Sequence, residues 1–440
     1  MPQWVTMFVP PQPRFRFYNG LRNYRLAFED LIAGRVFAGD AVEQAERRLA
    51  EWLDVGEAIL TPQGRYGIYL GLRETIRAGQ DVIMSPYTLY DVVNMVVAAG
   101  GVPRFADIEE ATCNLSPREV ERLIGPKTGA VLVTHLHGLS APLDQIRLIC
   151  QAHRIPLLED ACQAMGARYR GRKTGTLGAM GFFSFGRAKN VNAFFGGLIA
   201  TNDSVKAARI RKTLARLPYE DGTRLARRIA HCAAGHVATS RVPFSAFTYW
   251  IFRHGVLTGS EVVTGQFDTE VNPVLRAKIP EAYERRITQM QARLILDQID
   301  RVDSDSRARI ALAKIYFEGL RDIPGISLPP MRDDLSHIYL NYAIQVEDRG
   351  ALQRYMMKHG RDVAIQHIGN TADYPCFVEY RTDCPHARRT AARVLLLPTY
   401  PGYRPSEAIA NIGVIRRFFD RKITTSEPAE LHVAAGSKVM

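Results

Sequence analysis

The feature that most constrains this fold is an alternation of short apolar runs and helical stretches between residues 31 and 201. The runs have the length of strands and lack the strict alternation of a sheet with one solvated face. They are Ala58–Pro62, Asp81–Pro86, Val102–Ile108, Ala130–His135, Ile155–Glu159, Gly181–Phe185 and Gly197–Thr201. Such strands are covered on both faces, and helices between them impose mostly parallel pairing. The sequence therefore predicts an α/β fold whose large domain has a mostly parallel seven-stranded sheet between helices.

Helical patterns fill most of the gaps between these runs. Two of them follow the first and second runs, at Tyr66–Ala78 and Tyr90–Ala99. Two more precede the fourth and fifth runs, at Pro117–Ile124 with Ser116 as N-cap and at Leu143–His153. The last two runs are too close for a helix between them, so we expect them to pair differently from the others.

A helical segment is expected next. Residues 204–270 are Arg-rich at first and aromatic through Val237–Leu257, where Pro243 and several charged residues exclude a membrane-spanning helix. We interpret the segment as a helical hairpin packed on the domain or on a partner subunit. An interfacial membrane contact through residues 237–257 is the alternative.

The rest of the chain predicts a smaller α/β unit. Glu281–Leu320 has the pattern of one long amphipathic helix. The elements expected after it are strand Ile338–Val346, helix Gly350–Lys358, strand Val394–Pro398 and helix Pro405–Asp420. We thus expect four parts: an N-terminal arm (1–30), a large domain (31–270), a smaller C-terminal α/β domain (271–422) and a flexible tail (423–440).

Charge and cysteine usage narrow the function. The net charge of +12 raises the question of nucleic acid, but no binding motif is present and no aromatic residues are spaced along a basic strand for base stacking. We therefore expect no nucleic-acid partner and interpret the excess as a solvated basic face that suits phosphorylated substrates. The six cysteines lack the spacing of metal ligands, so we expect no metal site and free thiols in a reducing cytoplasm.

Two residues at strand ends indicate the chemistry. Asp160 ends a buried strand, where a parallel sheet presents its ligand crevice, and a carboxylate is costly to bury there without a cation. Lys189 follows the next strand, and a desolvated lysine near another cation such as Arg187 can lose its proton. A neutral amine can form an imine with an aldehyde, and a protonated pyridinium is a cation that a carboxylate can hold. Alone, each residue predicts only a turn or a surface charge; together they predict a pyridoxal-phosphate (PLP) site.

The surrounding segments resemble the DegT/StrS type of sugar aminotransferase, a PLP-dependent branch of fold type I, the aspartate-aminotransferase fold. Glu159-Asp-Ala-Cys-Gln163 is similar to the family's acidic strand end. Ser184-Phe-x-x-x-Lys-Asn190, followed by Gly196-Gly197, is similar to its lysine motif at the same spacing. The resemblance covers roughly residues 20–420. Further matching segments are Ala38-Gly-Asp, Ser85-Pro-Tyr-Thr88, His135-Leu-His-Gly138 and Leu396-Leu-Pro398.

The resemblance implies roles for four residues. Lys189 is the catalytic lysine that holds PLP as a Schiff base, and Asp160 is the partner of the ring nitrogen. Gln163 would lie against the ring near its phenolic oxygen, and Ser184 would bind the phosphate. The implied reaction moves an amino group from an amino acid, with glutamate expected, to a keto group on a nucleotide-linked sugar, in a homodimer. Two alternatives stay open: a non-sugar ketone as acceptor, and a family protein without turnover that acts as a ligand-binding or regulatory protein.

The phosphate loop departs from the family pattern. The family reads Ser-Gly-Thr before a helix, whereas this chain has Gln63-Gly-Arg-Tyr66. Gly64 keeps the close backbone approach at a helix N-terminus, and Arg65 replaces the hydroxyl. Arg65 would bind the phosphate if it points inward and would do nothing on the helix surface, and both interpretations stay open.

Two further positions depart from the pattern. The family stacks an aromatic side chain on the ring where this chain has Leu89. Either Leu89 packs on the ring face without aromatic overlap, or Tyr87 or Tyr90 takes this role; that both tyrosines are core residues is the other interpretation left open. A family asparagine that reaches the phosphate from the partner subunit falls near Glu284. A carboxylate would repel phosphate there, and the neighbouring Arg285 and Arg286 are candidate replacements.

Overall fold

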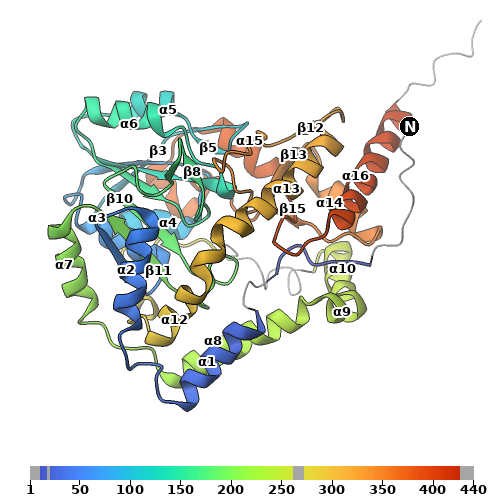
Figure 1. Cartoon of the computed structure of the whole chain (residues 1–440). Helices are drawn as coiled ribbons and strands as arrows, with labels where there is room; N and C mark the ends of the chain where they lie inside the picture. The colour runs from blue at the N-terminus through green and yellow to red at the C-terminus, as the bar shows by residue number, and fades with distance from the viewer. Residues whose placement is uncertain (1–9, 17–19, 261–271, 427–440) are drawn as a thin grey trace, which may run out of the picture.

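A computed structural model describes residues 10–16, 20–260 and 272–426 of the chain. It confirms the α/β class, with one seven-stranded sheet in the order β1-β11-β10-β7-β6-β2-β3 (Figure 1). The strands are β1 (Glu57–Thr61), β2 (Asp81–Met84), β3 (Val102–Phe105), β6 (Thr128–Thr134), β7 (Leu157–Asp160), β10 (Met180–Ser184) and β11 (Gly197–Thr201). Each of the seven expected runs forms a strand of this sheet.

Strand pairing confirms that the last two runs join the sheet differently. All neighbours pair in parallel except β11, which is antiparallel to β10 on one side and to β1 on the other. Gly197, the first residue of β11, pairs with Ser184 and with Thr61. A Cβ atom on Gly197 would lie 2.4 Å from the backbone nitrogen of Gly64, so only glycine allows the helix after β1 to start this close to the sheet.

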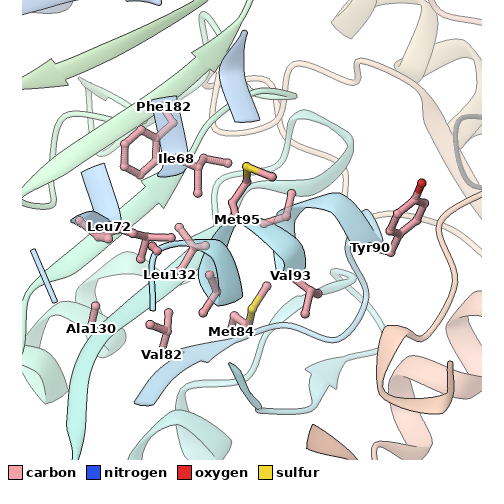
Figure 2. Close-up of a cluster of buried hydrophobic side chains, with 14 of the residues drawn as sticks. Ile68, Leu72, Val82, Met84, Tyr90, Val93, Met95, Ala130, Leu132 and Phe182 are labelled. Atoms are coloured by element: carbon pink, nitrogen blue, oxygen red, sulfur yellow. The ribbon is translucent and has the colours of Figure 1, made fainter. Parts of the chain in front are cut away.

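Helices cover both faces of the sheet. The strand residues alternate between faces although the runs are continuously apolar: Phe182 packs on one side and Phe183 on the other. On the first side lie α3 (Gly64–Arg73), α4 (Tyr90–Ala98) and α7 (Ser204–Leu214). Figure 2 shows Ile68 and Leu72 of α3 packed with the aliphatic residues of β2 and β6. On the second side lie α2 (Ala41–Leu53), α5 (Pro117–Leu123), α6 (Leu143–Ala152) and α12 (Gln289–Gln298).

A second, smaller sheet lies in the C-terminal part, as expected. Its order is β12-β13-β15-β14 and all its pairs are antiparallel. The strands are β12 (Ile326–Ser327), β13 (Tyr342–Val346), β14 (Ala364–Ile365) and β15 (Val394–Leu397). The helices beside them are α13 (Val302–Leu320), α14 (Arg349–Lys358), α15 (Pro385–Arg393) and α16 (Pro405–Ser426). Two short hairpins, β4–β5 (Ile108–Glu109 with Asn114–Leu115) and β8–β9 (Arg168–Tyr169 with Arg172–Lys173), complete the strands described.

The prediction of one long helix over Glu281–Leu320 is wrong, because the structure has two helices and two 3₁₀ turns there. A 3₁₀ turn, η4 (Glu281–Tyr283), comes first, and α12 starts only after Thr288, whose hydroxyl accepts the N–H of Gln291 at 3.2 Å. This capping box sets the start of the helix, and a second 3₁₀ turn, η5 (Ile299–Arg301), separates α12 from α13. The helix α12 packs on α2 and α1 (Leu21–Ile32), with the core of the large sheet. At the other end, α16 continues to Ser426, into the expected tail; residues 427–440 lie outside the described residues.

The Arg-rich and aromatic segment is helical, as predicted. It forms α8 (Gly222–Ala238), α9 (Arg241–Pro243), the π-helical turn η2 (Phe244–Thr248) and α10 (Tyr249–Thr258). Figure 1 shows α8 beside α1 and α10 beside α14, where Phe244 and Tyr249 pack on Met357. Residues 261–270 of the expected segment lie outside the described residues. Within the described part of the chain, every helix is too short or too polar to cross a bilayer.

Candidate active site

The carboxyl ends of β7 and β10 bring the two expected chemical groups to one edge of the sheet. Asp160 is the last residue of β7, is 4% exposed, and pairs with Thr134 of β6 and Phe182 of β10. Lys189 lies in the turn that follows β10, where its backbone N–H donates to the Gly186 carbonyl at 3.1 Å. The crevice at the strand ends is where parallel α/β sheets place ligands.

The Lys189 amine is set up to lose its proton. Lys189 is half-buried as a residue, and desolvation of its amine by the surrounding protein lowers the pKa of Lys189. Cys162 and Asp160 oppose the shift, whereas the Arg65 guanidinium adds to it. The lysine, the carboxylate and the arginine are therefore near enough to act on one another electrostatically.

Asp160 is a buried carboxylate without an ion-pair partner among the residues that the structure describes. Its Oδ1 accepts the backbone N–H of Cys162 at 3.1 Å, and no lysine or arginine in the described residues forms an ion pair with it. Burial and the nearby Asp160 carboxylate raise the pKa of the neighbouring Cys162 thiol well above its usual value. A buried carboxylate of this kind needs a cationic partner, and a protonated ring nitrogen is one.

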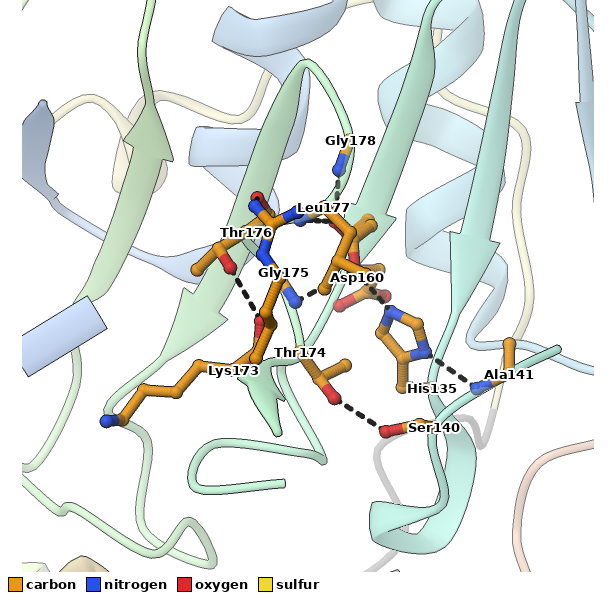
Figure 3. A network of polar contacts seen from close by, with 12 residues as sticks. His135, Ser140, Ala141, Asp160, Lys173, Thr174, Gly175, Thr176, Leu177 and Gly178 are labelled. Atoms are coloured by element: carbon orange, nitrogen blue, oxygen red, sulfur yellow. Dashed lines mark hydrogen bonds and ion pairs between the residues drawn. The ribbon is translucent and has the colours of Figure 1, made fainter. Parts of the chain in front are cut away.

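A second carboxylate, that of Glu159, binds donors from three segments at the strand end; Figure 3 shows the labelled His135, Gly175, Leu177 and Gly178 around it. Its Oε2 accepts from His135 Nε2 at 3.1 Å and from the N–H of Gly175 at 2.9 Å. Its Oε1 accepts from the N–H groups of Leu177 and Gly178 at 2.6 and 2.5 Å. Burial alone would raise the pKa of Glu159, but these donors hold it below the ordinary value, so the group is ionised.

The same network determines the state of His135. The N–H of Ala141 donates to His135 Nδ1 at 3.0 Å, so the ring proton is on Nε2, which faces Glu159. The backbone N–H of His135 donates to the Asp160 carbonyl at 3.0 Å. Glu159 and His135 thus anchor β6, β7 and the 175–178 loop around Asp160.

The N-terminus of α3 forms the third side of the site. A Cβ atom on Gly64 would lie 2.9 Å from Cys162 Sγ and 3.1 Å from Ser184 Cβ, so the helix start, the end of β10 and the residues after β7 meet here. The Ser184 hydroxyl also accepts the N–H of Gly186 at 3.4 Å. Arg65 is not a solvated surface charge, since its Nη1 contacts the buried Asp91 carboxylate and the Tyr283 hydroxyl. Arg65 directly follows Gly64, which lies against Ser184 and Cys162 at the same edge of the sheet.

Gln163 lies beside this site and orders the loop after β6. Its Oε1 accepts the backbone N–H of His137 at 2.9 Å. Burial, with a smaller contribution from His367, lowers the pKa of His137 to about 4, so this ring is neutral. The His137 ring nitrogens find no hydrogen-bond partner among the described residues.

The structure shows where the other two positions that depart from the family pattern, Leu89 and Glu284, lie. Leu89 is the N-cap of α4, two residues before Asp91, and is packed partly buried on the core that contains Tyr87 and Tyr90. Within this chain the Glu284 carboxylate lies beside the Tyr66 hydroxyl, and burial together with Glu284 raises the pKa of Tyr66.

The sequence did not predict the role of several residues that support the site. Glu159 and His135 lie inside segments that resemble the family, but the resemblance implied no role for either of them. The signal for Asp91 was an acidic residue in an apolar helix, which requires a partner when buried. For Tyr283 and Arg276, which also contact Asp91, the sequence holds no signal, because they lie far along the chain from α4.

The residues present fit the groups that PLP exposes. The desolvated amine can bond the aldehyde, the unmatched carboxylate can meet the ring nitrogen, and the helix N-terminus with Ser184 and Arg65 can bind a phosphate. The described residues contain no group of three or more His, Cys, Asp or Glu side chains that could hold a metal ion.

Comparisons with known proteins agree with this geometry. A relative, dTDP-3-amino-3,4,6-trideoxy-alpha-D-glucose transaminase of Streptomyces venezuelae, is 27% identical over 396 residues, which cover 89% of this chain and 90% of that protein. Another, L-glutamine:2-deoxy-scyllo-inosose aminotransferase of Micromonospora echinospora, is 29% identical over 75% of this chain and 70% of that protein. The crystal structure of S. venezuelae DesV with a ketimine intermediate matches with a TM-score of 0.74 and 26% identity, over 94% of this chain and all of that one.

The family assignment follows from the extent of the match. The sequence profile of the DegT/DnrJ/EryC1/StrS aminotransferase family matches residues 25–414, which include both sheets and every residue of the site. The family is one of transaminases and implies PLP as the cofactor. This chain belongs to the DegT/DnrJ/EryC1/StrS aminotransferase family.

Proposed function

We propose that this aminotransferase binds PLP through Lys189 and holds the cofactor's ring nitrogen with Asp160. One observation carries the proposal: a desolvated amine and a buried carboxylate without an ion-pair partner lie at the same edge of the sheet. The protonated ring nitrogen of PLP would give Asp160 the cationic partner that the described residues do not supply, and the aldehyde of PLP would bond the Lys189 amine.

The chain's residues have distinct tasks in this proposal. Bound PLP supplies an electron-deficient ring that stabilises negative charge on the carbon bearing the amino group. Asp160 keeps the proton on the ring nitrogen. Lys189, once neutral and released, would take a proton from that carbon and deliver it to the former aldehyde carbon of the cofactor, as net amino transfer requires. Its lowered pKa suits this task, because a lysine at its ordinary pKa would be protonated at neutral pH.

The remaining assignments concern cofactor binding. Ser184, the N–H groups that begin α3 at Gly64, and Arg65 bind the phosphate. Gln163 lies along the ring, and Leu89 packs on its face without aromatic overlap. Burial of Glu159 with its four donors keeps the strand end rigid, so that Asp160 stays in place.

For the substrates we propose glutamate as donor and a keto group on a nucleotide-linked sugar as acceptor. The S. venezuelae relative that acts on a dTDP-sugar supports this choice, and the net charge of +12 suits a phosphorylated ligand. A non-sugar ketone such as a cyclitol is the alternative, supported by the relative that acts on 2-deoxy-scyllo-inosose.

We also propose a homodimer in the cytoplasm. Apolar side chains stand exposed on α1 and on the η2–α10 stretch, where a partner subunit would cover them: Leu21, Phe28, Ile32, Phe247, Trp250 and Ile251. The six cysteines are free thiols, which supports a reducing compartment.

Borohydride reduction tests the proposal without requiring turnover. The purified protein with PLP should absorb in the visible, lose this band with glutamate, and after reduction carry the cofactor on the peptide that contains Lys189. Lys189→Ala should abolish the attachment. Lys173→Ala is the matched control, because the pKa of Lys173 is also lowered by burial, but its amine lies 4.3 Å over the Trp52 ring. Attachment to another lysine, or none at all, would refute the assignment.

A further inference from the structure

Asp91 brings a buried negative charge into the mostly apolar helix α4. Its Oδ2 contacts Arg65 Nη1 and accepts the Tyr283 hydroxyl at 2.5 Å. Its Oδ1 faces Arg276 Nη1 and Asn94 Nδ2, each at 3.2 Å. One carboxylate therefore joins two arginines and a tyrosine from three separate segments of the chain.

The Asp91 carboxylate at the centre of this cluster is ionised. Burial by itself would raise the pKa of Asp91, but the Arg65 guanidinium and the Tyr283 hydroxyl outweigh it, and the pKa is lowered. Asp91 thus carries its negative charge at neutral pH and contacts two guanidinium groups, those of Arg65 and Arg276. The positive charge of Arg65, which lies at a helix start, favours an anion nearby.

Arg65 is held in one geometry by these contacts. Besides the Asp91 contact, its guanidinium lies over the Tyr283 ring, 5.5 Å from the centroid, and its Nη1 is 3.2 Å from the Tyr283 hydroxyl. An arginine fixed on two sides loses little further rotamer entropy when it binds a ligand. The contacts therefore preorganise the guanidinium.

The fixed guanidinium stands at a helix start that faces the site. Arg65 is the second residue of α3, and Gly64, the first, lies against Ser184 and Cys162. The ten residues of α3 direct their first N–H groups to this edge, where the helix dipole also favours negative charge. Lys189 lies within electrostatic range of the same guanidinium.

We propose that Asp91 and Tyr283 are positioning residues, which hold Arg65 as the cation of a phosphate-monoester site at the N-terminus of α3. The ligand is the phosphate of the cofactor, so the inference rests on the proposed function and deepens it. Arg65 replaces a hydroxyl with a group that presents a planar fork of donors to phosphate. In this arrangement the Asp91 carboxylate, although it lies near an anion site, holds the Arg65 guanidinium in the orientation that binds the phosphate.

The test compares PLP with pyridoxal, which has the same ring and aldehyde but no phosphate. Dissociation constants of both are measured on the apo full-length protein by absorbance and fluorescence titration. Asp91→Asn should weaken PLP binding roughly ten-fold, the size of one charge-assisted hydrogen bond, and leave pyridoxal binding unchanged. In an Arg65→Ala background, which itself weakens PLP selectively, Asp91→Asn should have no further effect.

A matched control separates positioning from a merely structural role. Asp107 is also buried, but its carboxylate accepts the N–H groups of His386 and Ala387. Asp107→Asn should lower stability without changing the ratio of PLP to pyridoxal affinity. If Asp91→Asn does not fold, Tyr283→Phe removes one hydroxyl and should shift the ratio in the same direction.

Three results would overturn the inference. They are an unchanged or tighter PLP affinity in Asp91→Asn, equal weakening of PLP and pyridoxal, and an Asp91→Asn effect that persists without Arg65. In each of these cases the wild-type protein still forms the borohydride-reducible link at Lys189, and the proposed function stands. Absence of that link in the wild type removes both.

Discussion

Replacement of Glu159 by glutamine should destabilise the fold strongly although it changes only one atom. The carboxylate accepts four hydrogen bonds, two on each oxygen, from His135 and from the N–H groups of Gly175, Leu177 and Gly178. The glutamine amide has one acceptor oxygen and one NH₂ group, which only donates. In either orientation the NH₂ group replaces an oxygen that accepts two hydrogen bonds, so two buried N–H donors lose their acceptor. At roughly 1–3 kcal/mol for each unmatched buried donor, we expect a loss of about 2–6 kcal/mol.

Urea unfolding followed by far-UV circular dichroism at pH 7 measures this loss. Glu43→Gln is the control, because Glu43 is exposed on α2 and the same change should stay within about 0.5 kcal/mol. His135 cannot relieve the conflict by moving its proton, since its Nδ1 already accepts the N–H of Ala141. A loss below about 1 kcal/mol for Glu159→Gln would show that the network does not stabilise the strand end.

The same residue predicts a pH dependence. The pKa of Glu159 is lower in the folded protein than its ordinary value of about 4.3, so its ionisation stabilises the fold above that pH. This contribution is lost as the pH falls through the folded pKa. Unfolding free energies of the wild type should therefore drop below about pH 4 more steeply than those of Glu159→Gln.

Three further predictions concern the site and its support. Asp160→Asn should slow the reaction with glutamate at least about 100-fold, measured by stopped-flow absorbance, while borohydride still labels Lys189. Reconstitution of the apo-protein with PLP should accelerate with pH around a midpoint below the ordinary lysine value of about 10.4, because burial lowers the pKa of Lys189. Gly181→Ala should lower the unfolding free energy by roughly 1–3 kcal/mol, since its Cβ would meet the Gly175 carbonyl, whereas Gly222→Ala, in open space, should not.

The sequence predicted the features that are local. The seven strands follow from short apolar runs between turn signals, and each run identifies its strand without knowledge of its neighbours. Asp160 and Lys189 follow from their positions at strand ends, which a parallel sheet brings to one edge. The sequence also predicted the exceptional pairing of β11, because the chain between β10 and β11 is too short for a crossover helix.

The features that were not predicted depend on contacts between distant positions. The Asp91–Tyr283 hydrogen bond joins residues 192 positions apart, and no local sequence pattern predicts a partner at that distance along the chain. The orientation of Arg65 stayed open for the same reason, since only the folded chain shows that Asp91 and Tyr283 bind it. The expected helix over Glu281–Leu320 failed because its apolar periodicity continues through a region where the Thr288 cap restarts the helix.

The pairing of β1 has a consequence for biosynthesis. Its sheet partner in the described structure is β11, with Thr61 opposite Gly197, so β1 emerges long before the strand that will hold it. At roughly 5–20 residues per second, translation of the intervening residues takes on the order of ten seconds. During that interval the nascent chain exposes an unpaired apolar strand next to α2 and α3. A ribosome stalled before β11 should therefore present a chain that chaperones bind and proteases cleave near residue 60, and one stalled beyond β11 should not.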